Sequence, residues 1–291
     1  MVYELNSGAE KFYLKSYTPW NSVANVQKIH EVWDVLHANN FRFTPTAIKA
    51  HTDTTTKVDD GLVWEISTEV PGIEIAEDSN DIQLASLTRA IGNFHICLKD
   101  IQKDRGLRIA NVTNPQNVTN DLVWWTTKGE TSIKQAYDES IFVYANEFAK
   151  TSSNVFAYYL DIDWMEVDSK LPKSVIHRDL TKHNVLFTKN RMSGLIDFEI
   201  MQYGSRLHDI ARILIEFTDC SYEAIKIVVN EYGSLTDTEI KELKRWMLLL
   251  NCGLGFWTLK KLVDPKSNSP QIKEYLQSRL VKAVSIYDAL V

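Results

Sequence analysis

Cysteine is scarce in this sequence, with three residues among 291, Cys97, Cys220 and Cys252. An odd number of widely separated cysteines supplies neither a disulfide framework nor the paired spacing of a structural zinc site. We therefore expect a protein of a reducing compartment, with a cytoplasmic location.

An excess of basic residues is also missing, because 38 Asp and Glu outnumber 32 Lys and Arg and give a formal net charge of −6. Proteins whose main ligand is nucleic acid usually carry a basic face. We therefore expect no nucleic-acid partner. A small phosphorylated cofactor stays compatible with this charge, since a local group of donors and a metal ion can hold its phosphates.

No apolar run has the length of a membrane span, which needs about 20 residues. The most apolar stretch, 246–259, is interrupted by Asn251, Gly253 and Gly255. The N-terminus shows no basic segment followed by an apolar one, as a signal peptide would. We expect no membrane partner, and a composition of 44% apolar and 24% charged residues is that of a globular protein.

The hydrophobic periodicity changes along the chain and predicts an α+β fold. Strand-like runs occur at 2–5, 11–17, 46–51 and 61–70, with a helical pattern at 22–38. Beyond Gly72 the pattern is mostly helical, at 80–100, 131–150, 205–217, 236–260 and 270–290. One interruption, 174–198, has the pattern strand, loop, strand, turn, strand. We expect a small antiparallel N-terminal lobe over 1–72 and a larger helical lobe over 73–291.

The strongest motif lies in that interruption. Residues 177–184, HRDLTKHN, fit the pattern H-R-D-L-x-x-x-N in each fixed position, and Asp197 follows Asn184 by 13 positions. Phosphoryl transfer needs a group that orients the acceptor hydroxyl and oxygen ligands for divalent metal. Asp179 suits the first task. Asn184 and Asp197 suit the second, because a hairpin between them would bring both to one end.

The segment 175–214 resembles the core of the aminoglycoside phosphotransferase and choline kinase-like family, which are small-molecule kinases with a protein-kinase-like fold. The resemblance implies ATP and Mg²⁺ as cofactors. It implies that Asp179 is the catalytic base and that Asn184 and Asp197 are the magnesium ligands. By the same resemblance, Asp209 holds the backbone of the catalytic loop in place.

The N-terminal region offers matching nucleotide-binding residues. Lys15 stands in an apolar strand, as does the kinase lysine that contacts the α- and β-phosphates. Glu31, on the helix that follows, is the expected partner of that lysine. Glu69 and Val70 end the next strand and resemble the segment whose backbone pairs with the adenine edge.

One feature departs from the family pattern. Only 14 residues precede Lys15 and Gly8 is the sole glycine among them. We therefore expect either that the phosphate-covering loop is short or missing, or that Met1 is not the natural start. This departure keeps a second reading open, in which the protein is a catalytically weak pseudokinase that serves as a nucleotide-binding scaffold.

The acceptor is expected to be a hydroxyl of a small molecule. Asp209 follows Asp197 by 12 positions, and no Ala-Pro-Glu sequence closes an activation segment. A small Ser/Thr protein kinase is therefore the less favoured reading. The acids of residues 161–168 are compatible with an amine-bearing acceptor such as an aminoglycoside, an amino alcohol or homoserine. The sequence leaves open the acceptor, the choice of ATP over GTP, and the oligomeric state.

Overall fold

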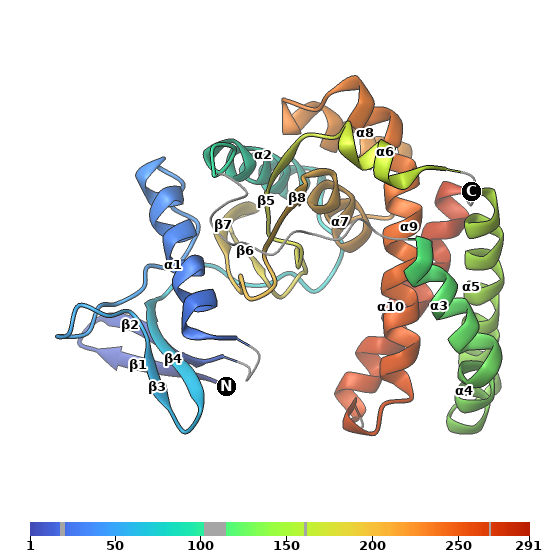
Figure 1. The fold of residues 1–291 in the computed structure, drawn as a ribbon, viewed down its shortest axis with the longest axis horizontal. Helices are drawn as coiled ribbons and strands as arrows, with labels where there is room; N and C mark the ends of the chain where they lie inside the picture. The colour runs from blue at the N-terminus through green and yellow to red at the C-terminus, as the bar shows by residue number, and fades with distance from the viewer. Residues whose placement is uncertain (18–20, 102–114, 160–161, 268) are drawn as a thin grey trace. The chain divides into compact units, whose positions relative to one another are not determined.

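The computed structural model describes residues 1–17, 21–101, 115–159, 162–267 and 269–291. Internal contacts divide these residues into two compact units (Figure 1). The first unit comprises the described parts of 1–110, 172–217 and 227–234. The helical unit comprises the described parts of 111–171, 218–226 and 235–291. The lobe boundary expected at residue 72 stays a prediction.

The first unit begins with an antiparallel sheet of four strands in the order β1-β2-β4-β3. The strands are β1 (Val2–Ser7), β2 (Glu10–Ser16), β3 (Lys57–Asp59) and β4 (Leu62–Thr68). Gly8 has a φ of 64° in the β1–β2 turn, a conformation that glycine adopts without strain. In the β2–β4 register, Lys15 is opposite Glu65 and Leu14 is opposite Ile66. Because side chains alternate along a strand, the two pairs lie on opposite faces of the sheet.

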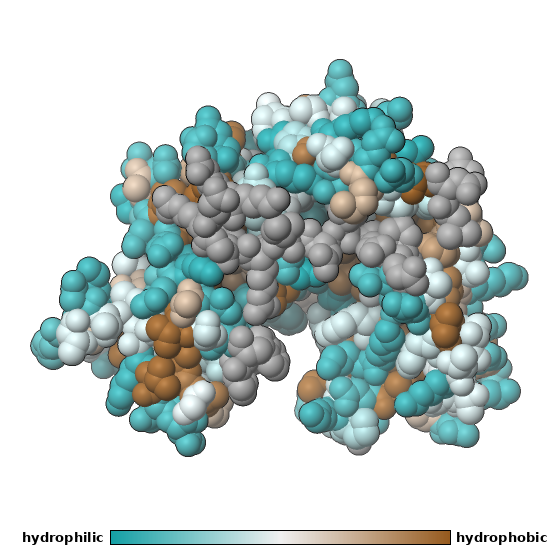
Figure 2. Space-filling view, viewed as in Figure 1, coloured by the Kyte–Doolittle hydropathy of each residue, from teal (hydrophilic) through white to brown (hydrophobic). Residues whose placement is uncertain are grey.

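The two faces of this sheet have different surroundings. Along β4, burial alternates residue by residue, and Val63 and Glu65 are 6% and 4% exposed. Helix α1 (Val23–Ala38) contributes a buried stripe to this side of the unit, including His30, which contacts Glu65. The other face is half-exposed, and Figure 2 shows an apolar patch over the sheet.

The strand expected at 46–51 is reduced to an isolated bridge, Ala47 with Ser67. Ile48 N–H donates to the Ile66 carbonyl at 2.8 Å, so pairing with β4 does begin. It ends at Ala50, whose carbonyl accepts from Asp53 N–H at 2.9 Å and closes a turn. The chain then leaves the sheet, and β3 pairs with the next part of the same edge of β4.

The rest of the first unit supports two short antiparallel pairs. Strand β5 (Lys173–Ile176) pairs with β8 (Gln202–Ser205), and β6 (Val185–Thr188) pairs with β7 (Arg191–Leu195). Helices α2 (Asp81–Cys97) and α7 (Leu207–Phe217) belong to the same unit. The strand, loop, strand, turn and strand expected over 174–198 are confirmed. Strand β8 was not expected, and the helix expected from 205 begins at Leu207.

The helical unit is built mainly from α5 (Glu139–Tyr158), α9 (Asp237–Leu262) and α10 (Pro270–Leu290). The shorter elements are α3 (Pro115–Trp124), the π-helix η2 (Trp125–Gly129), α4 (Glu130–Ala136), α6 (Trp164–Ser169) and the 3₁₀-helix η3 (Pro265–Ser267). Helix α8 (Tyr222–Tyr232) begins in this unit. Helices α5 and α9 pack closely because Gly255 has no side chain, and a Cβ there would lie 2.1 Å from a ring carbon of Phe148. No helix among the described residues is long and apolar enough to cross a membrane.

Candidate active site

The catalytic-loop motif follows β5 and is fixed through its backbone. The N–H groups of His177 and Arg178 each donate to a different carboxylate oxygen of Asp209, both at 2.8 Å. Asp209 lies in the first turn of α7, is 0% exposed, and also contacts His95 Nε2 at 3.1 Å. A buried carboxylate with three donors is a rigid anchor for the loop. The role expected for Asp209 agrees with this geometry.

Charge compensation keeps Asp209 ionised. Burial alone would raise the pKa of this carboxyl, but the hydrogen bond and positive potential of His95, with smaller contributions from His208 and His177, hold the pKa below its ordinary value. The carboxylate therefore accepts from the loop N–H groups as an anion.

Two loop residues have left-handed backbone conformations, Arg178 with φ of 73° and Asp197 with φ of 65°. Such conformations are unfavourable for residues other than glycine and are concentrated at functional sites. At Arg178, the hydrogen bond from its N–H to Asp209 helps to hold the strained geometry. The conformation sets the direction of the next residue, Asp179.

Both carboxylate oxygens of Asp179 have neighbours. The Asn184 amide nitrogen donates to Oδ2 at 3.0 Å and to the Asp179 carbonyl at 2.9 Å. Arg212 of α7 lies 3.6 Å from Oδ1 and 3.0 Å from Glu216. The Asp179 side chain is 35% exposed, whereas Arg212 is 5% exposed. Asp179 is thus an accessible carboxylate whose orientation is fixed from two sides.

Asn184 and Asp197 lie at the same end of the β6–β7 hairpin. The N–H of Ile196, the residue before Asp197, donates to the Asn184 carbonyl at 3.0 Å. An amide oxygen and a carboxylate are the kinds of ligand that Mg²⁺ prefers. The donor set therefore fits the metal that the sequence implied, and the three motif residues come together in the first unit.

Lys15 of β2 reaches this group from a distant part of the sequence. Its Nζ lies 2.8 Å from Asp197 Oδ1 and 2.9 Å from Glu199 Oε1. Burial opposes the charge of Lys15, but the two carboxylates outweigh it and raise the pKa above its ordinary value. Lys15 is therefore a cation beside the proposed metal ligands.

The expected pairing of Lys15 with Glu31 is wrong in this structure. Glu31 is exposed on α1, and the described partners of Lys15 are Asp197 and Glu199. The reason is the phase of the helix, since the buried side of α1 includes Ile29, His30 and Trp33, and Glu31 projects away from it.

Glu69 and Val70 follow β4, as expected. The Glu69 N–H donates to the Lys11 carbonyl at 3.2 Å, so this donor is used within the sheet. Val70 is 9% exposed and borders Gly194, where a Cβ would lie 2.4 Å from a Val70 methyl carbon. Contact of this segment with an adenine stays a prediction. Such a contact would have to use backbone groups of the segment other than the Glu69 N–H.

Sequence reasoning missed two residues of the site, Glu199 and Arg212. Glu199 Oε2 accepts from the Asn21 amide at 3.1 Å while Oε1 binds Lys15, so this carboxylate is also held from two sides. Arg212 follows Asp209 by three positions on α7. That spacing places both residues on one side of a helix, and it was the signal in the sequence that Arg212 lies near the catalytic loop.

The same fold occurs in solved structures of small-molecule kinases, at low sequence identity. An aminoglycoside phosphotransferase from Alicyclobacillus acidocaldarius is 15% identical, with a TM-score of 0.67 over 99% of this chain and 90% of that one. A spectinomycin phosphotransferase in complex with ADP and spectinomycin is 12% identical, with a TM-score of 0.66 over 99% of this chain and 88% of that one. The protein-kinase-like fold expected from the sequence is confirmed.

A model of the phosphotransferase enzyme family matches residues 1–238. The chain therefore belongs to this family, and the family resemblance of segment 175–214 is confirmed.

Curated relatives match over shorter stretches. A homoserine kinase of Methylobacillus flagellatus is 30% identical over 101 residues, which are 33% of this chain and 31% of that protein. The "Uncharacterized protein MG356 homolog" of Mycoplasma pneumoniae is 26% identical over 133 residues, 46% of this chain and 45% of that protein. The chain thus spans less than half the length of the curated relatives it matches.

Proposed function

We propose that this protein transfers the γ-phosphoryl group of ATP to a hydroxyl of a small molecule, with Mg²⁺ as the metal. The observation that carries the proposal is the convergence of Asp179, Asn184, Asp197 and Lys15 within one compact unit. These are the groups that phosphoryl transfer requires for the nucleophile, the metal and the phosphates.

Asp179 orients the acceptor hydroxyl and takes its proton at a carboxylate oxygen. Asn184 and Arg212 restrict the rotation of this carboxylate, so little reorientation is needed when the acceptor binds. Lys15 binds the phosphates of ATP. Asn184 and Asp197 hold Mg²⁺, which when bound neutralises charge on the phosphates.

The short connection between Asp197 and Asp209 supports a small acceptor. It holds strand β8 and the turn in which Met201 N–H donates to the Phe198 carbonyl at 3.1 Å. A segment so short offers little surface for docking a peptide, which supports a small acceptor over a protein substrate. Among hydroxyl compounds, homoserine, amino alcohols and aminoglycosides are the classes to test first, the first because of the homoserine kinase relative.

The test is a screen of these three classes, read by release of ADP. We expect Mg²⁺-dependent turnover with at least one class, and its loss in Asn184→Ala and Asp197→Ala. Thermal stabilisation of the wild type by ATP and Mg²⁺ checks nucleotide binding separately. Stabilisation without turnover would favour the pseudokinase scaffold. Phosphorylation of a generic protein substrate, with no small acceptor, would favour a protein kinase.

A further inference from the structure

Tyr17 is a buried residue beside the lysine of the site. It is 2% exposed, and its N–H donates to the Val63 carbonyl at 2.9 Å, so it continues the edge of β2. Two positions separate it from Lys15, which places both side chains on one face of the sheet. The Lys15 Nζ lies 4.8 Å from the centre of the Tyr17 ring, within the range of a cation–π contact.

The Tyr17 side chain shares a face of the sheet with Glu65, a carboxylate that is 4% exposed, because Tyr17 N–H pairs with Val63, two positions before Glu65. Burial and the negative charge of Glu65 raise the pKa of Tyr17, so the hydroxyl stays protonated and donates. Glu65 stands directly opposite Lys15 in the sheet register. The ring of Tyr17 is therefore fixed at its far end by a residue of the neighbouring strand.

Glu65 is itself held from helix α1. Its Oε2 contacts His30 Nε2, and His30 Nδ1 lies 2.7 Å from the Thr55 hydroxyl. His30 is 6% exposed, so the two contacts lie in the interior. A chain of polar contacts thus runs from Thr55 through His30 and Glu65 to Tyr17.

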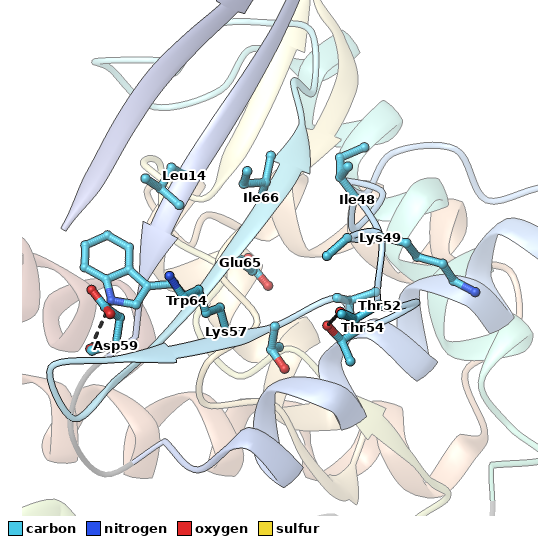
Figure 3. A pocket seen from close by; sticks show the side chains of 13 residues that line it. Leu14, Ile48, Lys49, Thr52, Thr54, Lys57, Asp59, Trp64, Glu65 and Ile66 are labelled. Carbon is cyan, nitrogen blue, oxygen red and sulfur yellow. Dashed lines mark hydrogen bonds between the residues drawn. The ribbon is translucent and has the colours of Figure 1, made fainter.

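Thr55, at the far end of this chain of contacts, lines a groove of about 660 Å³ in the first unit. Figure 3 shows Glu65 among the side chains that line this groove. Thr55 and Glu65 line the groove together with apolar side chains, including Leu14, Trp64 and Ile66. In contrast, the end at Tyr17 faces Lys15 and, through it, Asp197.

We propose that Tyr17, Glu65 and His30 are positioning residues for Lys15, in the place of the helix glutamate expected at position 31. The Tyr17 ring forms one side of the space available to the lysine chain and keeps Nζ near Asp197 and Glu199. Glu65 and His30 keep the ring in that orientation. A lysine confined before binding loses less conformational freedom when it takes up phosphate.

The direct test measures the order of the Lys15 side chain by ¹³C relaxation in protein labelled with ¹³C-lysine, with the resonances assigned through Lys15→Arg. We expect Tyr17→Leu to lower the order of this side chain, and Tyr17→Phe and Glu65→Gln to lower it less. Tyr3→Phe is the matched control, because Tyr3 lies on the opposite face of the sheet, is 48% exposed and lacks a contact with Lys15 among the described residues. An unchanged order of the Lys15 side chain in Tyr17→Leu and Glu65→Gln, both folded, would overturn the proposal.

Nucleotide affinity gives a second readout, and this one rests on the proposed function. A fluorescent ATP analogue with Mg²⁺ should bind about tenfold more weakly to Tyr17→Leu, the scale of one desolvated cation–π contact. The double variant Tyr17→Phe/Glu65→Gln should bind the analogue no more weakly than the more affected single variant, because each substitution breaks the same interaction. Fully additive losses would contradict a shared path. If the wild type binds no nucleotide, the proposed function fails, while the order of the Lys15 side chain still decides the positioning role.

Discussion

The catalytic loop and the lysine strand are held in the site by different kinds of interaction. The loop is held through its backbone, by two N–H groups that donate to the buried carboxylate of Asp209. The amine of Lys15 is held beside this loop by side-chain contacts, which are ion pairs with Asp197 and Glu199 and the ring of Tyr17. A backbone anchor fixes every side chain that follows it, whereas a side-chain anchor fixes one group. The difference predicts that damage to the loop is severe and that damage around Lys15 is graded.

The largest effect is expected at the acceptor carboxylate. Asp179→Ala should lower kcat by about 10³-fold, within the range of a lost general base, with the unfolding midpoint unchanged. ADP release with the acceptor found in the screen measures it. Asp34→Ala, which removes an exposed carboxylate of α1, is the control and should keep full activity. A turnover number within threefold of wild type would remove Asp179 from the mechanism.

Asp209→Asn tests the backbone anchor. It leaves an amide where two loop N–H groups and His95 require an anion, so we expect the free energy of unfolding to fall by about 2–3 kcal/mol. Urea denaturation measures this change. Asp81→Asn is the matched control, since Asp81 also lies in a first helical turn but is exposed. Equal changes in both variants would mean that only the helix dipole is involved.

The lysine partners are separated by comparing Glu199→Gln with Glu31→Gln. Glu199→Gln removes one of the two ion pairs of Lys15, and we expect nucleotide affinity to fall about fivefold, the size of one partly buried pair. Glu31→Gln should leave it unchanged. Titration with the fluorescent ATP analogue distinguishes them, and the reverse order of effects would restore the helix glutamate as the partner.

Arg212 adds a side-chain contact to the backbone-anchored loop. We therefore expect removal of its guanidinium to have a smaller effect on turnover than Asp179→Ala. We expect Arg212→Met to lower kcat about fivefold with little change in KM for ATP, because the guanidinium orients Asp179 and not the phosphates. Arg212→Lys should recover part of the loss. Arg191→Met, at an exposed position of β7, is the control. A change in KM for ATP alone would place Arg212 elsewhere in the mechanism.

A pH dependence of stability is also expected near the loop anchor. Burial, together with Arg178 and Arg212, lowers the pKa of His208 to about 4 from an ordinary 6.5. The unfolded chain therefore binds more protons between these values, and stability should fall as pH drops from about 6.5 to about 4. Urea midpoints across this window measure the slope. His208→Asn should flatten it, and an identical slope in that variant would assign the effect to other groups.

The loop could be located from the sequence because its chemistry lies in one local stretch. The eight-residue motif and the hairpin to Asp197 bring the groups together through short connections, whatever surrounds them. The pairing of Lys15 with Glu31 failed for a local reason too. The apolar stripe of α1 already places Glu31 on the outer side of the helix. The expectation of a Lys15–Glu31 pair rested only on the order of strand, lysine, helix and glutamate along the chain.

The sequence by itself determined the class of fold and located the residues proposed to act on the acceptor, because periodicity and motif spacing act over a few tens of residues. Only the tertiary structure decided which acids receive Lys15, that Arg212 reaches Asp179, and that His30 and Glu65 lie behind Tyr17. These contacts join segments far apart in the chain. Their partners depend on how strands register and on which segments pack together, and neighbours in sequence do not determine either.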